Sequence, residues 1–98
     1  MEDVIVPAIV EFEVHRWALR HPDEDRAAAY AALLRRASCV PTDGPLALEA
    51  AVLAVRYHLA ACDALIYATA TLSGARLVTT DAEFDGLPGV EFHAKPGR

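Results

Sequence analysis

The stretch CDALIYATATLSGARLVTTD, from Cys62 to Asp81, gives the clearest indication of the fold. Its segment DALIYATATL predicts a nearly uncharged helix, which the Ser73-Gly74 pair would end. The segment RLVTT then predicts a short buried strand. Asp63 stands near the start of this apolar run and Asp81 closes it, with no lysine beside either carboxylate. A helix and a strand in this order would bring both aspartates to one edge of a sheet.

The rest of the chain alternates helices with short apolar strands. Strands are predicted in DVIVP, SCVP and VEFHA, and helices from Ala8 to Arg20, across HPDEDRAAAYAALLRRA, and from Pro45 onward. The helix from Pro45 has one predicted apolar face, formed by Leu48, Val52, Val55 and Leu59. This alternation predicts an α/β fold in which helices cover both faces of the sheet.

Size and composition predict a single domain spanning residues 1–98. The chain has 98 residues, and 54% of them are hydrophobic, which is not the composition of a disordered protein. Charges interrupt every apolar run, so no segment reaches the length of a membrane span. The acidic start MEDVIVPAIVEF does not resemble a secretory signal. We therefore expect a cytoplasmic protein that does not associate with a membrane.

Charge and cysteine content limit the classes of function. The net charge of −5 counts against a basic surface for nucleic acid, although this objection weakens if some acidic residues gather around a cation. The two cysteines, Cys39 and Cys62, have neither the spacing of a zinc site nor the density of a disulfide framework. Their apolar surroundings predict two reduced, buried thiols.

Three acidic residues map to the carboxyl ends of the predicted strands, where open α/β sheets form their sites. Asp81 follows the strand RLVTT directly, and Glu13 lies in the helix that follows VIVP. Asp63 starts the uncharged helix whose chain returns as that strand. Thr79 precedes Asp81, and its hydroxyl can face the same site. We expect these side chains to share one edge of the sheet.

Carboxylates that gather without a cationic partner repel one another, and a bound cation is the usual relief. Oxygen-only ligands suit hard ions such as Mg²⁺ or Mn²⁺. Such an ion can activate water and stabilise charge on a phosphate. Asp85 is a candidate for a further supporting ligand, although Asp85-Gly86 is also an ordinary turn dipeptide.

Each acidic residue also has a purely structural interpretation. Asp63 could be the N-cap of its helix, and Asp81 could be a turn residue after a strand. Glu13 could be a solvated helix residue. The histidines show no metal spacing and no paired nucleophile, and we interpret them as structural or surface residues; they are His15, His21, His58 and His93.

These residues resemble the PIN domain, in particular the VapC type of ribonuclease toxin from bacterial toxin–antitoxin modules. The resemblance is carried by VPAIVEFEVHRWALR, by ACDALIYATATLSGARLVTTDAEFDGLPGVEF and by the helix between them, so it runs from about Val4 to Phe92. It implies a three-layer α/β/α fold with a mostly parallel sheet. It also implies that the chain begins at the second strand of that fold, without the first strand and helix.

The resemblance implies a metal-dependent endoribonuclease that hydrolyses RNA phosphodiester bonds with metal-activated water. It assigns the Mg²⁺ or Mn²⁺ ligands to Glu13, Asp63 and Asp81, and a supporting role to the hydroxyl of Thr79 and, more weakly, to Asp85. The implied partners are an RNA substrate, a cognate antitoxin protein and a second copy of the chain in a homodimer.

The family's first strand carries an aspartate that this chain does not supply. Asp3 lies at the amino end of its predicted strand, which is the wrong edge of the sheet for the site. A second hypothesis follows: a catalytically impaired fragment that acts only in dimerisation or antitoxin binding. A third, an unrelated receiver-like binding domain, would need an acidic pair after the first strand, and none is present.

Overall fold

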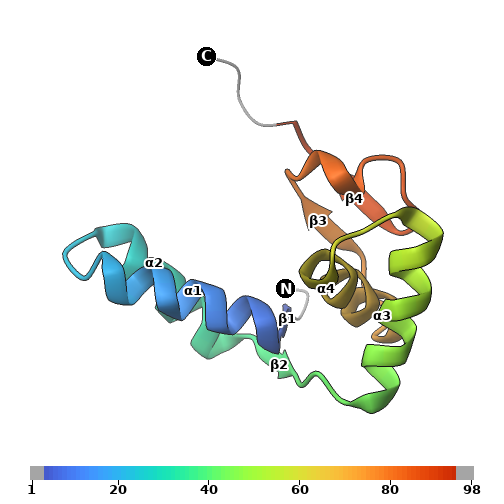
Figure 1. Cartoon of the computed structure of the whole chain (residues 1–98). Helices are drawn as coiled ribbons and strands as arrows, with labels where there is room; N and C mark the ends of the chain where they lie inside the picture. The colour runs from blue at the N-terminus through green and yellow to red at the C-terminus, as the bar shows by residue number, and fades with distance from the viewer. Residues whose placement is uncertain (1–3, 95–98) are drawn as a thin grey trace. The chain divides into compact units, whose positions relative to one another are not determined.

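The computed structural model describes residues 4–94, which form an α/β protein with parallel strand pairs and four α-helices (Figure 1). The chain divides into two compact units, Met1–Gly44 and Pro45–Arg98. We call them the N-terminal and the C-terminal unit and describe each by itself. The single domain and the lack of a first strand, both expected from the sequence, stay predictions.

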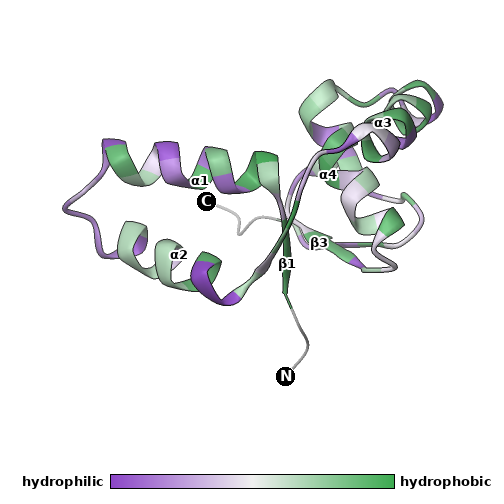
Figure 2. Ribbon diagram, turned by 90° about the horizontal axis from the view of Figure 1, so that it is seen from below, coloured by the Kyte–Doolittle hydropathy of each residue, from purple (hydrophilic) through white to green (hydrophobic). Residues whose placement is uncertain are grey.

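The N-terminal unit is a helical hairpin followed and preceded by short strands. Strand β1 (Ile5–Pro7) pairs in parallel with β2 (Ser38–Val40), with Val6 opposite Cys39. Between them lie α1 (Ala8–Arg20) and α2 (Asp25–Arg36), which pack side by side (Figure 1). Figure 2 shows hydrophobic and hydrophilic turns alternating along α1, as expected for a helix with one packed face. The predicted strands and helices of this unit are therefore confirmed.

Local sequence explains where these two helices begin and end. Pro7 precedes the first turn of α1 with φ at −63°, a value that its ring fixes. Pro22 follows the C-cap residue His21, and the residue before a proline is disfavoured in the helical conformation. Helix α2 has Asp25 in its first turn and arginines in its last turn, the charge order that stabilises a helix dipole.

The C-terminal unit contains two helices and a second parallel strand pair. Its elements are α3 (Gly44–Tyr57), α4 (Ala61–Leu72), β3 (Leu77–Thr79), the short 3₁₀-helix η1 (Ala82–Phe84) and β4 (Val90–Phe92). Strand β3 pairs in parallel with β4, so the chain crosses over through η1 between them. The structure thus confirms parallel pairing, and residues 4–94 form two strand pairs, one in each unit.

The buried face of α3 differs from the one expected from the sequence. Leu48, Val52 and Val55 are 73%, 48% and 79% exposed; Leu59, the only buried residue of the predicted set, lies beyond the end of α3 at Tyr57. The buried residues of α3 are Leu46, Ala50 and Leu53. Both sets have helical spacing, and α3 is apolar around most of its circumference. Periodicity alone therefore could not select the face that packs.

The thiols are also exposed, contrary to the prediction of burial. Cys39 lies on β2, and Cys62 lies in the first turn of α4; both are free cysteines. Ala64, two residues after Cys62, is 1% exposed. Apolar neighbours in the sequence therefore did not predict burial, because the side of the helix on which a residue lies decides it.

Among residues 4–94 no single helix is long and apolar enough to cross a membrane. Helices α3 and α4 reach the length and apolar character of a membrane span only when they are taken together, and the chain bends by 114° at the break between them.

Gly74 ends α4 in the left-handed conformation, and its replacement provides a test of this turn. Its φ is +65°, and the next amide, Ala75 N, donates to Ala70 O at 2.9 Å. A Cβ at Gly74 would meet no atom within 4 Å, so Gly74→Ala should cost only the backbone strain, about 1–2 kcal/mol. Urea unfolding followed by circular dichroism measures it. Gly44→Ala, at the start of α3, is the matched control and should cost nothing, and an equal loss in both variants would contradict this account.

Candidate functional site

The carboxyl end of β3 carries a turn built by Thr79 and Asp81. The backbone N–H of Asp81 donates to Thr79 Oγ1 at 3.0 Å, and Asp81 Oδ1 accepts from Glu83 N at 3.0 Å. Asp81 is thereby the N-cap of η1, and its side chain is exposed. The structural interpretation of Asp81 as a turn residue is correct. The same turn fixes its carboxylate at the strand end where α/β proteins form sites.

Asp63 lies in the first turn of α4, but it is not the N-cap. The N-cap residue is Ala60, which makes no side-chain cap hydrogen bond. The N-cap interpretation of Asp63 is therefore wrong by three residues. A carboxylate in the first turn of a helix is favoured by the helix dipole, and Asp63 is half-buried there.

A buried aromatic pair links the helix of Asp63 to the turn of Asp81. Tyr67 lies four residues after Asp63 and therefore on the same face of α4. Its ring centroid is 6.2 Å from that of Phe84 in an edge-on arrangement, and Phe84 is the last residue of η1. Tyr67 and Phe84 are 4% and 3% exposed. The face of α4 that carries Asp63 is thus held against the short helix that Asp81 caps.

A second contact strengthens this connection. Tyr67 Oη donates to the backbone carbonyl of Pro88 at 2.5 Å, in the loop between η1 and β4. Burial raises the pKa of the Tyr67 phenol above its usual value, so the hydroxyl stays protonated and keeps donating. The segment that contains Asp81 and Asp85 is therefore anchored at Phe84, between the two aspartates, and at Pro88, after them.

Asp85 occupies the other end of η1. It is the C-cap residue, it is exposed, and its backbone N–H donates to Ala82 O at 3.1 Å. Thr79, Asp81 and Asp85 therefore belong to one short segment around η1, as the sequence predicts.

Glu13 lies in the N-terminal unit, on an exposed position of α1. The predicted trio of carboxylates thus comes from both units of the chain. Within residues 4–94, no group of three or more His, Cys, Asp or Glu side chains is arranged to hold a metal ion. That Glu13 joins the two aspartates stays a prediction.

The donor chemistry nevertheless suits a hard cation. Among the described residues, neither Glu13 nor Asp81 forms an ion pair. The described ion pairs of the C-terminal unit instead go to Glu91, which His93 hydrogen-bonds at 2.5 Å and Arg76 approaches at 3.3 Å. The hydrogen bond from His93 and the charge of Arg76 lower the pKa of the Glu91 carboxyl. Carboxylates with no basic partner are the oxygen ligands that Mg²⁺ and Mn²⁺ prefer.

The contact between Tyr67 and Phe84, which anchors η1 against α4, was not predicted from the sequence. One signal was available: Phe84 is the only large apolar residue in the polar segment TTDAEFDG. Such a residue in a loop commonly anchors it to a core. Tyr67, by contrast, is one of many apolar residues on α4, and nothing in the sequence marks it as the partner of Phe84.

Replacement of Thr79 by valine tests its hydroxyl as a positioning group. Thr79→Val keeps the β-branched shape of the strand end but removes the acceptor for Asp81 N. For the RNA cleavage that the sequence resemblance implies, we expect kcat/KM to fall by roughly 10- to 100-fold, as is typical when a group that orients a metal ligand is lost. Thr79→Ser keeps the hydroxyl and should retain most of the activity. Equal activity of the valine and serine variants would show that the hydroxyl does not position Asp81.

Comparisons with known proteins relate this fold to others. A chain in the solved structure "Toxin-antitoxin complex from Klebsiella pneumoniae" is similar to this one, with a TM-score of 0.78 and 28% sequence identity. The similarity covers 89% of this chain and 71% of that one. The comparison with curated proteins gave no match.

The family model described as "PIN domain" matches residues 1–90, which include β1 to η1 and the positions of Glu13, Asp63 and Asp81. The match agrees with the resemblance that the sequence motifs carry. The chain belongs to the PIN domain family.

Proposed function

We propose that this protein is a Mg²⁺- or Mn²⁺-dependent endoribonuclease of the VapC type, the toxin of a toxin–antitoxin module. It acts on RNA in the cytoplasm, forms a homodimer and is inhibited by a cognate antitoxin. The proposal is supported by membership of the PIN family and by the similarity to the Klebsiella pneumoniae structure, whose title describes a toxin–antitoxin complex.

The observation that carries the proposal is the turn at the carboxyl end of β3. There the Thr79 hydroxyl accepts from the backbone N–H of Asp81, and the Asp81 carboxylate accepts from the backbone N–H of Glu83, each at 3.0 Å. The contact between Tyr67 and Phe84 fixes this turn against the face of α4 that bears Asp63.

The roles of the residues follow from their chemistry. Asp63, Asp81 and Glu13 would hold the cation through carboxylate oxygens, and Thr79 orients Asp81. When bound, such an ion supplies activation of water and stabilisation of charge on the phosphate. Asp85, at the other end of η1, would support the same site.

Cleavage of a single-stranded RNA by the purified chain tests this function. Cleavage is expected with Mg²⁺ or Mn²⁺, to stop with EDTA and to resume when Mn²⁺ is added back. RNA that stays intact under all of these conditions would contradict the proposal that this chain is a nuclease. The chain would then be a module for dimerisation or antitoxin binding, which sedimentation analysis and a binding assay with a cognate antitoxin would measure.

A further inference from the structure

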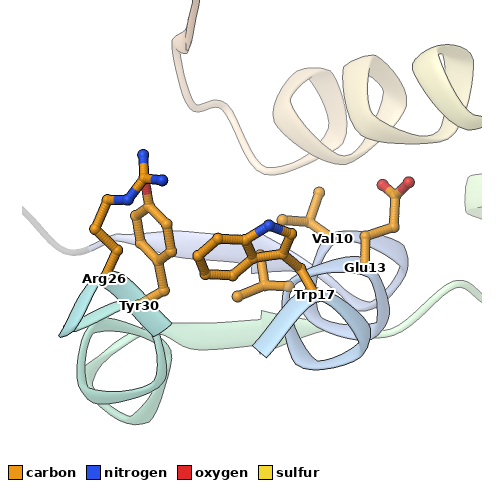
Figure 3. Close-up of a pocket in the computed structure, with 6 residues that line it drawn as sticks. Val10, Glu13, Trp17, Arg26 and Tyr30 are labelled. Atoms are coloured by element: carbon orange, nitrogen blue, oxygen red, sulfur yellow. The ribbon is translucent and has the colours of Figure 1, made fainter. Parts of the chain in front are cut away.

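A groove between α1 and α2 has the features of a nucleobase site. It has a volume of about 490 Å³ and is lined by Val10, Glu13, Val14, Trp17, Arg26 and Tyr30. All six residues belong to the N-terminal unit. Figure 3 shows Arg26 at one end of this row and Glu13 at the other, with Tyr30 and Trp17 between them.

The aromatic residues of the groove form a partly open platform. The rings of Trp17 and Tyr30 meet edge to face, with centroids 5.8 Å apart and an angle of 65°. The ring of His21 stacks on Trp17 at 4.8 Å, and its Nδ1 lies 2.9 Å from the Trp17 carbonyl oxygen. Trp17 is therefore held from within the hairpin. Tyr30 is 46% exposed and offers the aromatic surface on which a planar ligand can stack.

The groove has a cationic group, Arg26, at one end and an anionic group, Glu13, at the other. The guanidinium of Arg26 lies 5.8 Å from the Trp17 ring, and its only described ion pair is a surface contact of 3.7 Å with Glu24. The hairpin from residue 8 to residue 36 has five arginines and five acidic residues, so it is neutral, whereas the whole chain carries −5. Phosphate is thus repelled least on this part of the chain.

The groove also adjoins a predicted site residue. Trp17 follows Glu13 by four residues, slightly more than one helical turn, or about 6 Å along α1. An RNA strand with its phosphate near Glu13 would therefore place a neighbouring nucleotide over the aromatic residues.

We propose that the groove between α1 and α2 binds a nucleobase of the RNA substrate by stacking on Tyr30, with Arg26 contacting an adjacent phosphate. The proposal rests on the proposed function, because it takes RNA as the substrate. Trp17 packs edge to face against Tyr30, and Glu13, which lines the groove, is also one of the predicted cation ligands. Base stacking on an aromatic residue tolerates any base, so this contact would add affinity without sequence specificity.

The single tryptophan of the chain makes the test direct, because Trp17 lines this groove. In EDTA, where no cleavage occurs, a short single-stranded oligoadenylate should quench Trp17 emission. It should bind roughly tenfold or more tighter than an oligomer of the same length with abasic residues. Tyr30→Ala should remove this preference for bases, and Tyr30→Phe should keep it. Phe12→Ala, which removes an exposed aromatic residue of α1 outside the groove, should leave it unchanged.

Equal affinity for the two oligomers, or a preference for bases that survives in Tyr30→Ala, would overturn the proposal. So would a Tyr30→Ala variant that binds RNA normally and loses only self-association or antitoxin binding, since the groove would then be a protein interface. Failure of the proposed function gives a different result. A chain that binds base-bearing RNA preferentially but does not cut it with Mn²⁺ would support the nucleobase groove and contradict the proposed nuclease function.

Discussion

Asp81→Asn should abolish metal-dependent RNA cleavage while leaving the turn around η1 intact. The asparagine side chain keeps an oxygen that can accept from Glu83 N, the bond that Asp81 Oδ1 makes at 3.0 Å. It loses the negative charge that a cation needs. We expect the cleavage rate to fall by more than about 100-fold, because even outer groups around metal ligands typically change activity by 10- to 100-fold. Initial rates at saturating Mn²⁺ measure the effect.

Two further variants complete this experiment. Asp63→Asn should give a loss of similar size, because both aspartates are assigned to the same ion. Glu49→Gln removes one negative charge from α3 outside the site, and it should cleave at the normal rate. If Glu49→Gln were as slow as Asp81→Asn, the loss would reflect net charge and not a lost metal ligand.

Phe84→Ala should produce the largest loss of stability in the C-terminal unit. Phe84 is 3% exposed, and it is the contact through which η1 packs on Tyr67. Truncation of a buried phenylalanine typically costs about 3–5 kcal/mol, a large share of the about 5–15 kcal/mol that stabilises a whole domain. Urea unfolding followed by far-ultraviolet circular dichroism measures this cost. The turn of Asp81 should also lose its fixed position, so cleavage should fall with stability.

Phe84→Leu separates the two effects. Leucine refills most of the volume and should cost clearly less than alanine, about 1–2 kcal/mol. Its cleavage rate should stay within a few-fold of the unchanged protein, because η1 would still be anchored. A stable leucine variant that does not cleave RNA would mean that the phenyl ring itself acts in the reaction, which this account does not allow.

The order of elements was largely predictable from the sequence. Pro7 and Pro22 marked the ends of α1, the charges of α2 matched its dipole, and Ser73-Gly74 predicted the end of α4. These signals are local, because a proline ring or a glycine with positive φ acts on the backbone of its own turn. The position of Asp81 at the end of β3 was predictable for the same reason.

Features that depend on packing were not predictable. The sequence could not decide whether Leu46 or Leu48 would be buried on α3, because both faces are apolar. The exposure of Cys39 and Cys62 depends on which side of each element is covered. The contact between Tyr67 and Phe84 joins residues 17 positions apart in the chain. Periodicity contains no information about such a pair.

The most direct test of the central claim is Mn²⁺-induced broadening of amide resonances in the uncut protein. In the proposed function, Glu13, Asp63 and Asp81 bind one ion. Substoichiometric Mn²⁺ should therefore broaden the amides around all three residues together, and those of the η1 segment with them. In Asp81→Asn the three regions should stay sharp at the same concentration. Broadening that leaves residues around Asp63 and Asp81 sharp, or that is the same in Asp81→Asn, would contradict a cation site built from these carboxylates.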